Sequence, residues 1–442
     1  MSIDYTGIYG ANAWVKASDF NVDYSVIIIG AGPSGVILYH KLMSIGVTDV
    51  LVIDRNSDHD IGSWGIHCYN ERLRSPKDIN GWEESSCDLS IEYFIRERYG
   101  DQYWLECVNL TRFDWISYVS WFKDRVGVRG IYHANVNRFY FHDNAISLKI
   151  NANGSELVIR CRCLVVASGM AGYGGWYVPR ELERIIPSEF LVHANDPILG
   201  SLGFKEKAVL IVGAGASAFD AAHVGIMGGA KSIDVVYRRD SIPTKEYYRE
   251  MEKYIFLENY YSLSDVNKIK IFRAINKNGT PPASHNFNRV LASDKARVYS
   301  RPDLYQQISV KGGKIRLGIQ EYDIVISATG FCVECEREEL FSPFCDDIVK
   351  WGDIYQGLDD RALEGWEKYP YLGSHYQMRF KNKSWAGIFL FNGGSTMSMG
   401  QIGSVSISSY KFGLNRLARG ISMFFTSLLE DRISDDIVEY FS

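Results

Sequence analysis

Short apolar runs rich in β-branched residues recur along the chain, and each leads into small or polar residues. They lie at 25–29, 50–53, 163–167, 207–212, 233–237, 323–330 and 387–391. Runs of this length without polar alternation predict strands buried on both faces, as in a parallel sheet. Apolar and aromatic positions three and four residues apart, around Trp115, Val119 and Phe122, predict helix within 89–126. The pattern therefore predicts an α/β fold.

The first run leads into three glycines spaced as GxGxxG. The first permits a tight turn, the second lets a pyrophosphate approach, and the third lets the next helix pack close to the strand. A proline stands at the expected helix start, where free N–H groups attract phosphate. Asp54, which ends the second strand, is spaced to accept hydrogen bonds from a ribose. A flexible glycine turn would not explain this order, so we expect a dinucleotide site. Its residues are Gly30, Gly32, Pro33, Ser34, Gly35, Asp54 and Arg55.

The strand at 207–212 leads into a second such motif, GAGASA, followed by a helix rich in small residues. Its residues are Gly213, Gly215, Ala216, Ser217 and Ala218. The next strand ends in Arg238 and Arg239, where the first copy has an acid. An acid at that position would repel a ribose 2′-phosphate, whereas arginine fits one. The alternative is a solvated strand end. We expect a second dinucleotide that carries a 2′-phosphate.

The segments between these motifs are less regular. Residues 131–166 alternate and carry a turn at Asn153-Gly154, which predicts a small antiparallel insert. Residues 240–321 are more polar and include a hairpin-like VKGGKIRL. After the strand at 387–391, a glycine-rich turn precedes a helix expected to reach about residue 419.

Composition narrows the class of protein. The chain has 442 residues, 46% apolar and 23% charged, with a formal net charge of −5, which fits a globular protein of two or three domains. No basic run favours nucleic acid, and no segment resembles a signal peptide or a membrane span. Eight cysteines in a chain this long do not suggest a disulfide framework, so we expect a reduced, cytoplasmic protein. No HExxH, paired zinc CxxC or GxSxG motif occurs, so we expect neither a metal site nor a triad.

The two motifs, together with DIVISATGF at 323–331, resemble the two-dinucleotide-binding-domain flavoproteins over about 25–415. Within that superfamily the chain looks most like the class B flavin-containing and N-hydroxylating monooxygenases. The resemblance implies two Rossmann-like domains, one inserted into the other. The FAD domain would comprise 1–175 and 322–442, and the NADPH domain 176–321 with a helical insert. Ala328, Thr329 and Gly330 would lie beside the cofactor.

Three further stretches are similar to short sequence motifs of these monooxygenases. Gly62-Ser63-Trp64 resembles a Gly-Thr-Trp whose tryptophan lies against the flavin, and His67 follows in the same loop. His193 matches a cofactor-domain histidine, although Pro187 and Glu189 replace the Phe and Gly of that motif. Lys77, within SPKDI, resembles a lysine that touches the substrate in amino-acid N-hydroxylases; the alternative is a solvated loop residue.

Other positions are assigned through the same resemblance. Asn80 is a candidate to hydrogen-bond a peroxyflavin, and the alternative is a turn asparagine before Gly81. The superfamily often has a Gly-Asp near the flavin ribityl chain. This chain lacks it, and Asn392 and Gln401 are candidate substitutes.

The resemblance implies that NADPH reduces FAD and that a peroxyflavin passes one oxygen atom from O2 to a small molecule. We expect N-hydroxylation of an amine or amino-acid-like compound. Sulfur oxidation and Baeyer–Villiger chemistry are alternatives. A disulfide reductase using Cys332-x-x-Cys335 is a third, although the pair follows the ATG strand instead of the first nucleotide motif. A non-catalytic FAD-holding protein would not need the second motif. Substrate identity and assembly into a homo-oligomer stay open.

Overall fold

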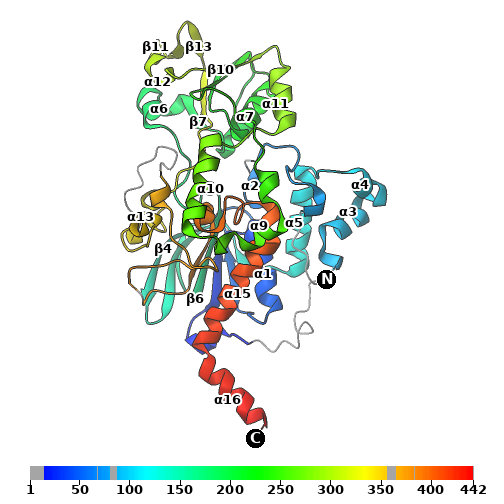
Figure 1. The fold of residues 1–442 in the computed structure, drawn as a ribbon, viewed down its shortest axis with the longest axis vertical. Coiled ribbons are helices and arrows are strands. Elements are labelled where there is room, and N and C mark those ends of the chain that lie inside the picture. Colours follow the sequence, from blue (N-terminus) through cyan, green and yellow to red (C-terminus); the bar gives the residue numbers. More distant parts are fainter. Residues whose placement is uncertain (1–13, 67, 80–86, 356–364, 383, 442) are drawn as a thin grey trace.

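The computed structural model describes residues 14–66, 68–79, 87–355, 365–382 and 384–441. Two sheet-containing domains are stacked along the long axis of the molecule (Figure 1). The chain leaves the first domain after β6, builds the second, and returns after β14. The predicted α/β architecture, with one domain inserted into the other, is confirmed.

A seven-stranded sheet forms the core of the first domain, in the order β3-β2-β1-β6-β5-β4, with β15 also pairing β6. The pairs among β1, β2, β3, β6 and β15 are parallel, whereas β4, β5 and β6 form antiparallel pairs. The predicted antiparallel insert is therefore an extension of the first sheet. Its turn has positive φ at Asn153 (51°) and Gly154 (81°). The strands are β1 (Tyr24–Ile29), β2 (Val50–Ile53), β3 (Gly130–Ile131), β4 (Ala134–His142), β5 (Ala145–Ala152), β6 (Ser155–Gly169) and β15 (Ile388–Asn392).

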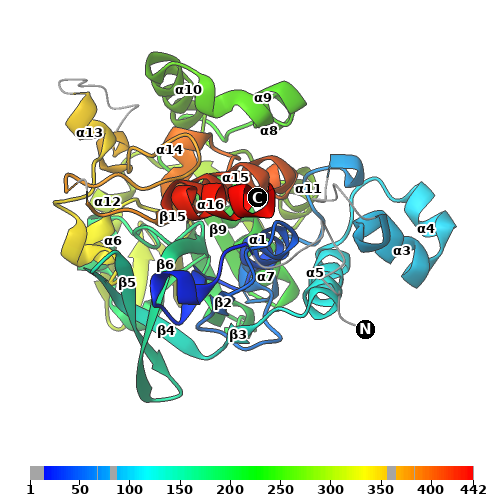
Figure 2. The ribbon, with the colours of Figure 1, turned by 90° about the horizontal axis from the view of Figure 1, so that it is seen from below.

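Helices cover the first sheet and extend to one side. Helix α1 (Pro33–Ser44) packs against α15 (Tyr410–Leu428) and α5 (Arg112–Val126), as Figure 2 shows from below. The predicted helical stretch at 89–126 contains α3 (Ile91–Tyr99), α4 (Asp101–Glu106) and α5. Gly100, with φ of 87°, separates the first two, and Thr111 caps α5 by accepting from the Asp114 N–H at 3.0 Å.

A five-stranded parallel sheet forms the second domain, in the order β10-β9-β8-β14-β7. Its strands are β7 (Leu191–His193), β8 (Ala208–Val212), β9 (Ser232–Tyr237), β10 (Ala296–Ser300) and β14 (Ile324–Ser327), and α7 (Ala216–Met227) packs against α11 (Ser284–Leu291). The strand β10 was not predicted, because ARVYS has no long apolar run. The predicted hairpin is present and turns at Gly312-Gly313 within the sheet of β11 (Ile308–Lys311), β12 (Lys314–Leu317) and β13 (Gln320–Tyr322).

The return to the first domain comes later than predicted. The strand β14 pairs with β8 and β7, so the sequence up to Ser327 belongs to the second sheet and the expected boundary at 322 is wrong. An apolar run identifies a buried strand but not the sheet that it joins. The two connections, 170–178 and 328–334, lie side by side: Trp176 pairs with Phe331, and the Tyr177 N–H donates to the Gly330 carbonyl at 2.9 Å.

The helical insert, expected as part of the NADPH domain, also packs on the first domain. Helix α9 (Tyr254–Asn259) contacts α15, and α10 (Asp265–Asn278) contacts α14 (Thr396–Met399); all four helices are labelled in Figure 2. Phe272 of α10 lies in one apolar cluster with Trp351 and Met397. The insert therefore bridges the two domains.

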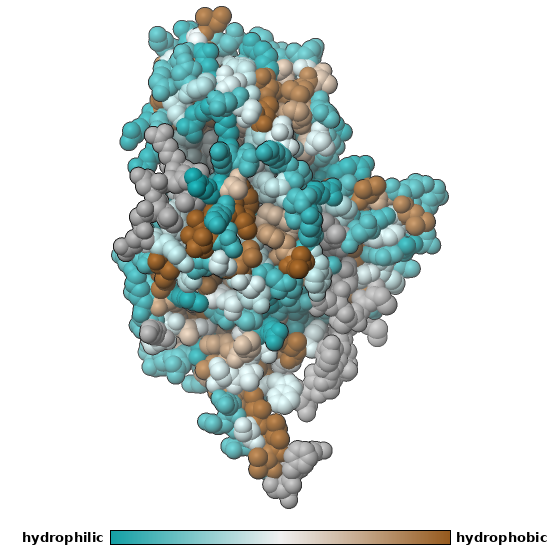
Figure 3. All heavy atoms as spheres, in the orientation of Figure 1, coloured by the Kyte–Doolittle hydropathy of each residue, from teal (hydrophilic) through white to brown (hydrophobic). Residues whose placement is uncertain are grey.

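The remaining helices are short or peripheral: α2 (Gly62–Ile66), α6 (Arg180–Ile185), α8 (Tyr248–Met251), α12 (Leu304–Gln307), α13 (Trp351–Ile354) and α16 (Glu430–Phe441). Helix α15 continues nine residues past the predicted end at 419, to Leu428. On the face drawn in Figure 3, hydrophilic side chains predominate and hydrophobic ones form small groups. Among the described residues, none of the helices combines the length and apolar character needed to cross a membrane.

Candidate functional site

The first glycine loop is fixed by close backbone contacts. A Cβ at Gly35 would lie 1.9 Å from the Gly30 carbonyl oxygen, and one at Gly30 would lie 2.5 Å from the Ala167 oxygen. Only glycine fits either position. At Gly32 the nearest atom to such a Cβ is the Gly62 Cα, at 3.6 Å, so the protein itself leaves room there. With Pro33 opening α1, this geometry fits a pyrophosphate against the helix N-terminus.

Asp54 is built into the same loop. Its carboxylate accepts from the Ala31 N–H at 2.6 Å and from the Asn56 N–H at 2.8 Å. These bonds aim the half-buried side chain at the loop, and each oxygen retains a lone pair for a ribose hydroxyl. Arg55, the next residue, is exposed.

The Gly62-Ser63-Trp64 stretch forms α2 directly beside this loop. A Cβ at Gly62 would lie 3.1 Å from the Gly32 Cα. Ser63 is exposed, and Trp64 is half-buried with its ring edge-on to Trp115 at 6.3 Å between centroids. The placement agrees with a tryptophan near the first cofactor, while its contact with the flavin stays a prediction. His67 and Asn80 lie outside the described residues.

The Lys77 side chain contacts α4. Its ammonium donates to the Trp104 carbonyl and lies 4.7 Å from the centroid of the Trp104 ring, on α4. A substrate carboxylate would have to compete with this carbonyl and ring. The assigned contact with substrate is therefore a prediction that requires Lys77 to exchange partners.

The second glycine loop repeats the first with one difference. A Cβ at Gly213 would lie 2.3 Å from the Ala328 oxygen, so ATG of 328–330 lies against this loop. Gly215 precedes α7, and a Cβ there would lie 3.3 Å from the Thr280 oxygen. The buried Ala218 replaces the third glycine, and Ala216 and Ser217 are half-buried. The loop fits a second pyrophosphate at the N-terminus of α7.

The two arginines that follow β9 face different partners. Arg239 donates to the carbonyls of Lys277 (2.9 Å) and Asn276 (3.1 Å), whereas the Arg238 guanidinium lies 4.8 Å from the centroid of the Tyr305 ring. Both arginines are exposed.

His193 ties the two inter-domain connections to the second sheet. Its Nδ1 accepts from the Asn195 N–H at 3.1 Å, so Nε2 carries the proton and donates to the Gly330 carbonyl at 3.1 Å. The ring stacks on Trp176 at 5.3 Å. The Thr329 hydroxyl, on the second connection, donates to the Tyr177 carbonyl of the first connection at 2.5 Å. His193 thus holds the connections, and a direct cofactor contact stays a prediction.

The C-terminal candidates also acquire structural partners. Asn392 is fully buried; its amide N–H₂ donates to the Gly172 carbonyl (2.8 Å) and the Ser168 hydroxyl (3.2 Å), and its oxygen accepts from the Gly394 N–H (2.9 Å). These bonds join the ends of β15 and β6 and leave little of the amide for a flavin. Gln401 is half-buried in the turn before α15.

Tyr410 is a residue that the sequence analysis missed. It opens α15, is buried, and hydrogen-bonds Ser34 of the first loop; burial raises its pKa to about 12, and this bond opposes the rise. A glycine-rich turn before a helix was recognised in the sequence, but nothing local indicated which loop that helix would meet.

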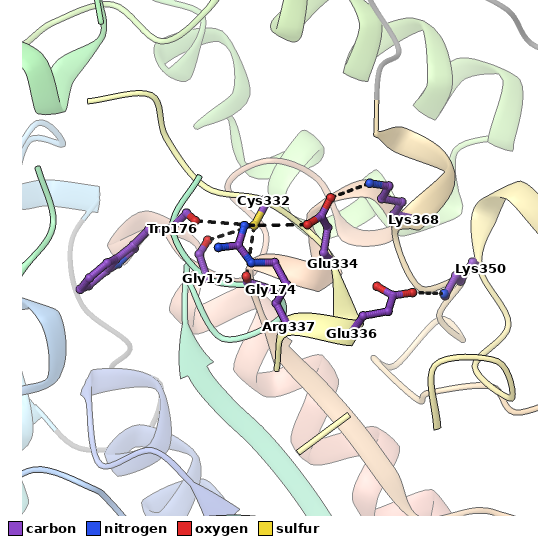
Figure 4. Close-up of polar contacts among 9 residues, drawn as sticks. All are labelled: Gly174, Gly175, Trp176, Cys332, Glu334, Glu336, Arg337, Lys350 and Lys368. Atoms are coloured by element: carbon purple, nitrogen blue, oxygen red, sulfur yellow. Dashed lines mark hydrogen bonds and ion pairs between the residues drawn. The ribbon is translucent and has the colours of Figure 1, made fainter. Parts of the chain in front are cut away.

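The two cysteines of the CxxC motif have separate surroundings, and Figure 4 shows those of Cys332. The Cys332 thiol lies 3.1 Å from the Gly174 carbonyl and 3.4 Å from the Arg337 guanidinium. Cys335 is buried with Cys345 and beside Glu336; the three ligand atoms lie within 4.8 Å of one another and could hold a metal ion. The Lys350 ammonium, 3.3 Å from the Glu336 carboxylate, opposes a cation there. The free thiols are Cys68, Cys107, Cys161, Cys163, Cys332, Cys335 and Cys345.

Comparisons with known proteins agree with this geometry. The family model of L-lysine 6-monooxygenase/L-ornithine 5-monooxygenase matches residues 91–283. An FAD-dependent urate hydroxylase from Xanthomonas campestris pv. campestris is 26% identical over 429 residues, which cover 94% of this chain and 89% of the relative. The ornithine hydroxylase from Pseudomonas aeruginosa has the same fold, with a TM-score of 0.69, 17% identity, and coverage of 90% of this chain and 98% of that one. A bacillithiol disulfide reductase from Bacillus cereus shares the fold less closely, with a TM-score of 0.54, 14% identity, and coverage of 90% and 99%.

Two dinucleotide loops in this order, one in each domain, give the fold with two dinucleotide-binding domains that these structures share. The sequence matches agree with the predicted class of flavin-dependent monooxygenase: the chain is similar to the lysine and ornithine monooxygenase family over 91–283 and to an FAD-dependent hydroxylase over most of its length. The predicted enzyme class and the cofactor pair, FAD and NADPH, are confirmed by these relatives.

Proposed function

We propose that this protein transfers one oxygen atom from O2 to the nitrogen of a small amine or amino-acid-like substrate. The observation that carries the proposal is the match of the lysine and ornithine monooxygenase family to residues 91–283. That stretch spans α3 to α5 and most of the second domain, including the second glycine loop.

When held at the first loop, reduced FAD would supply the chemistry that activates O2. The chain supplies binding and orientation: α1 receives the pyrophosphate, Asp54 the ribose, and α2 brings Trp64 to the same side of the loop. The second loop and Arg238 hold NADPH. The substrate amine must be neutral to act as a nucleophile, so activity should rise as pH approaches its pKa.

Lys77 remains the proposed substrate-binding residue, and Asn80 remains a candidate for the hydrogen bond to the activated oxygen. Lys77 would pair with a substrate carboxylate after leaving the Trp104 carbonyl. Lys77→Ala should raise the KM for substrate strongly and divert oxygen to hydrogen peroxide, while NADPH-dependent flavin reduction stays near wild type. An unchanged KM would remove Lys77 from the site.

A second candidate is hydroxylation of a planar purine at carbon. The urate hydroxylase, which aligns with 94% of this chain, favours it. The two candidates differ in the atom oxidised, so product analysis separates them.

The test is NADPH consumption with mass detection of a product gaining one oxygen, using ornithine, lysine and urate as probes. An N-hydroxylated amine supports the proposal, and a hydroxylated purine favours the alternative. The control is Gly32→Val, whose side chain enters the space beside Gly62 that the pyrophosphate needs. Oxygenated product from a Gly32→Val protein without bound FAD would contradict the site assignment.

The reductase alternative has its own variant. Cys332→Ser combined with Cys335→Ser should leave oxygen insertion intact, because the two thiols face different partners. A wild type that reduces a disulfide, together with a double variant that cannot, would favour the reductase.

A further inference from the structure

The carboxyl ends of β9 and β10 form one edge of the second sheet. The two strands are parallel, with Tyr237 opposite Ser300, and the Arg301 N–H donates to the Tyr237 carbonyl at 2.7 Å. Ligands of open α/β sheets bind outside this edge. Arg238 and Arg239 follow β9 there, and Tyr305 lies on α12, just after β10.

Arg239 is occupied by the fold. Its two terminal nitrogens donate to the carbonyls of Asn276 and Lys277, in the last turn of α10. Carbonyls at a helix C-terminus have no partner within the helix and carry partial negative charge, which a guanidinium satisfies. A 2′-phosphate could recruit Arg239 only by breaking both bonds.

Arg238 is arranged differently. It is exposed, and among the described residues its guanidinium makes no hydrogen bond or ion pair; its central carbon lies over the Tyr305 ring, 4.8 Å from the ring centroid. A ring face restrains the guanidinium by a cation–π contact and leaves its N–H edge free. That edge matches the oxygens of a phosphate.

We infer that Arg238 alone reads the 2′-phosphate, that Tyr305 is the positioning residue that holds its guanidinium, and that Arg239 serves the fold. The inference rests on the proposed use of NADPH. The two adjacent arginines look equivalent in the sequence, but one binds the nucleotide and the other caps a helix.

The Tyr305 hydroxyl supplies a matched control. It is buried and has no hydrogen-bond partner within the described part of the chain. Tyr305→Phe therefore keeps the ring under Arg238 and removes no hydrogen bond. Tyr305→Leu removes the aromatic face.

The experiment measures binding of 2′,5′-ADP and of 5′-AMP by calorimetry to the FAD-bound enzyme, and reports the ratio of the two affinities. Arg238→Ala should lower this ratio roughly 10- to 100-fold, the cost of losing charge-assisted hydrogen bonds. Tyr305→Leu should lower it about 2- to 5-fold. Tyr305→Phe and Arg239→Ala should leave it at the wild-type value. The relative rates of flavin reduction by NADPH and NADH should follow the same order.

A ratio unchanged in Tyr305→Leu would overturn the role of Tyr305. A ratio lowered as much in Arg239→Ala as in Arg238→Ala would overturn the division between the arginines. Equal binding of both probes by the wild type would overturn the inference while leaving oxygen transfer intact. Selective binding without any oxygenated product would instead count against the proposed function alone.

Discussion

The two glycine loops share one sequence pattern but are packed differently. In the first, Gly35 lies so close to the Gly30 carbonyl that a Cβ would be 1.9 Å from its oxygen. In the second, the equivalent residue is Ala218, whose methyl group is fully buried without such a clash. The first helix therefore packs closer to its strand. The same motif can thus accommodate two different distances between the helix and its strand.

The two residues proposed to meet the ribose also differ in how firmly the fold holds them. Asp54 is tied into its loop by two backbone N–H groups, whereas Arg238 is exposed and lies on an aromatic ring. The first loop is also covered, by α2 at Gly62 and by Tyr410 of α15. We interpret the first loop as a site that keeps its cofactor within the fold and the second as a site that exchanges one.

The largest expected effect comes from exchanging the third residues of the two loops. Gly35→Ala should lower the free energy of unfolding by about 3 kcal/mol and abolish copurified flavin, because backbone must move to admit the methyl group. The matched Ala218→Gly should cost about 1 kcal/mol through helix propensity. Urea unfolding and flavin absorbance measure both. Equal costs would show that the loops pack alike.

The next largest loss of stability should come from removing the carboxylate of Asp54. Asp54→Ala leaves the N–H groups of Ala31 and Asn56 without their acceptor, which should cost about 2 kcal/mol of stability. Arg238→Ala should change stability by less than about 0.5 kcal/mol, because the side chain is exposed. The midpoints of urea unfolding, compared at equal dependence of the unfolding free energy on urea concentration, measure both losses. Similar losses in the two variants would contradict the contrast between anchored and free ribose residues.

An effect of similar size should appear on acidification, through His40 of α1. Its ring packs edge-on to Phe122 at 5.4 Å, and burial lowers its pKa to about 4. An unfolded histidine titrates near 6.5, so the unfolded state binds the proton first as pH falls. The contribution is fully present above pH 6.5 and is lost toward pH 4, by about 2 kcal/mol at pH 5.

His40→Gln is the matched variant, and the difference between its stability and that of wild type isolates this residue. Thermal unfolding between pH 5 and 7.5 measures it. The position equivalent to His40 in α7 is His223, which bonds Glu71 at 3.1 Å instead of packing on an aromatic ring. A constant difference across this pH range would show that the His40 proton is not linked to folding.

The smallest effect concerns the cap of α10. Arg239→Ala should cost roughly 0.3–1 kcal/mol, since two carbonyls at a helix C-terminus lose a cation. Arg238→Ala, its neighbour, is the control. A loss from Arg238→Ala as large as that from Arg239→Ala would contradict the assignment of Arg239 as the cap.

The local sequence contained enough to predict both loops. A buried strand, glycines at fixed spacing and a following helix form one local unit, and the close approach of Gly35 to the Gly30 carbonyl lies within it. The carbonyls of Ala167 and Ala328, which require glycine at Gly30 and Gly213, come from distant parts of the chain. The turn at Asn153-Gly154 was predicted for the same reason, since positive φ is a local demand. The expected helix at 89–126 was found, but its break at Gly100 was not foreseen.

Partners distant in the chain could not be predicted in this way. Asn392 looked available for a cofactor, yet its amide is used to join β15 to β6. Lys77 resembled a lysine that contacts substrate, yet its ammonium lies against the Trp104 ring. In both cases the side chain's chemistry was evident, but the group that satisfies it comes from another part of the fold.

The sequence by itself determined the two nucleotide loops, their order, and the acid and arginines that follow them, because each depends on spacing along one strand–helix–strand unit. Only the tertiary structure decided that β14 completes the second sheet, that the helical insert packs on the first domain, and that Arg239 caps α10 while Arg238 lies on Tyr305. Apolar periodicity says that a face is buried but not against what. A guanidinium at a strand end likewise has no fixed role until the fold brings a carbonyl or a ring to it.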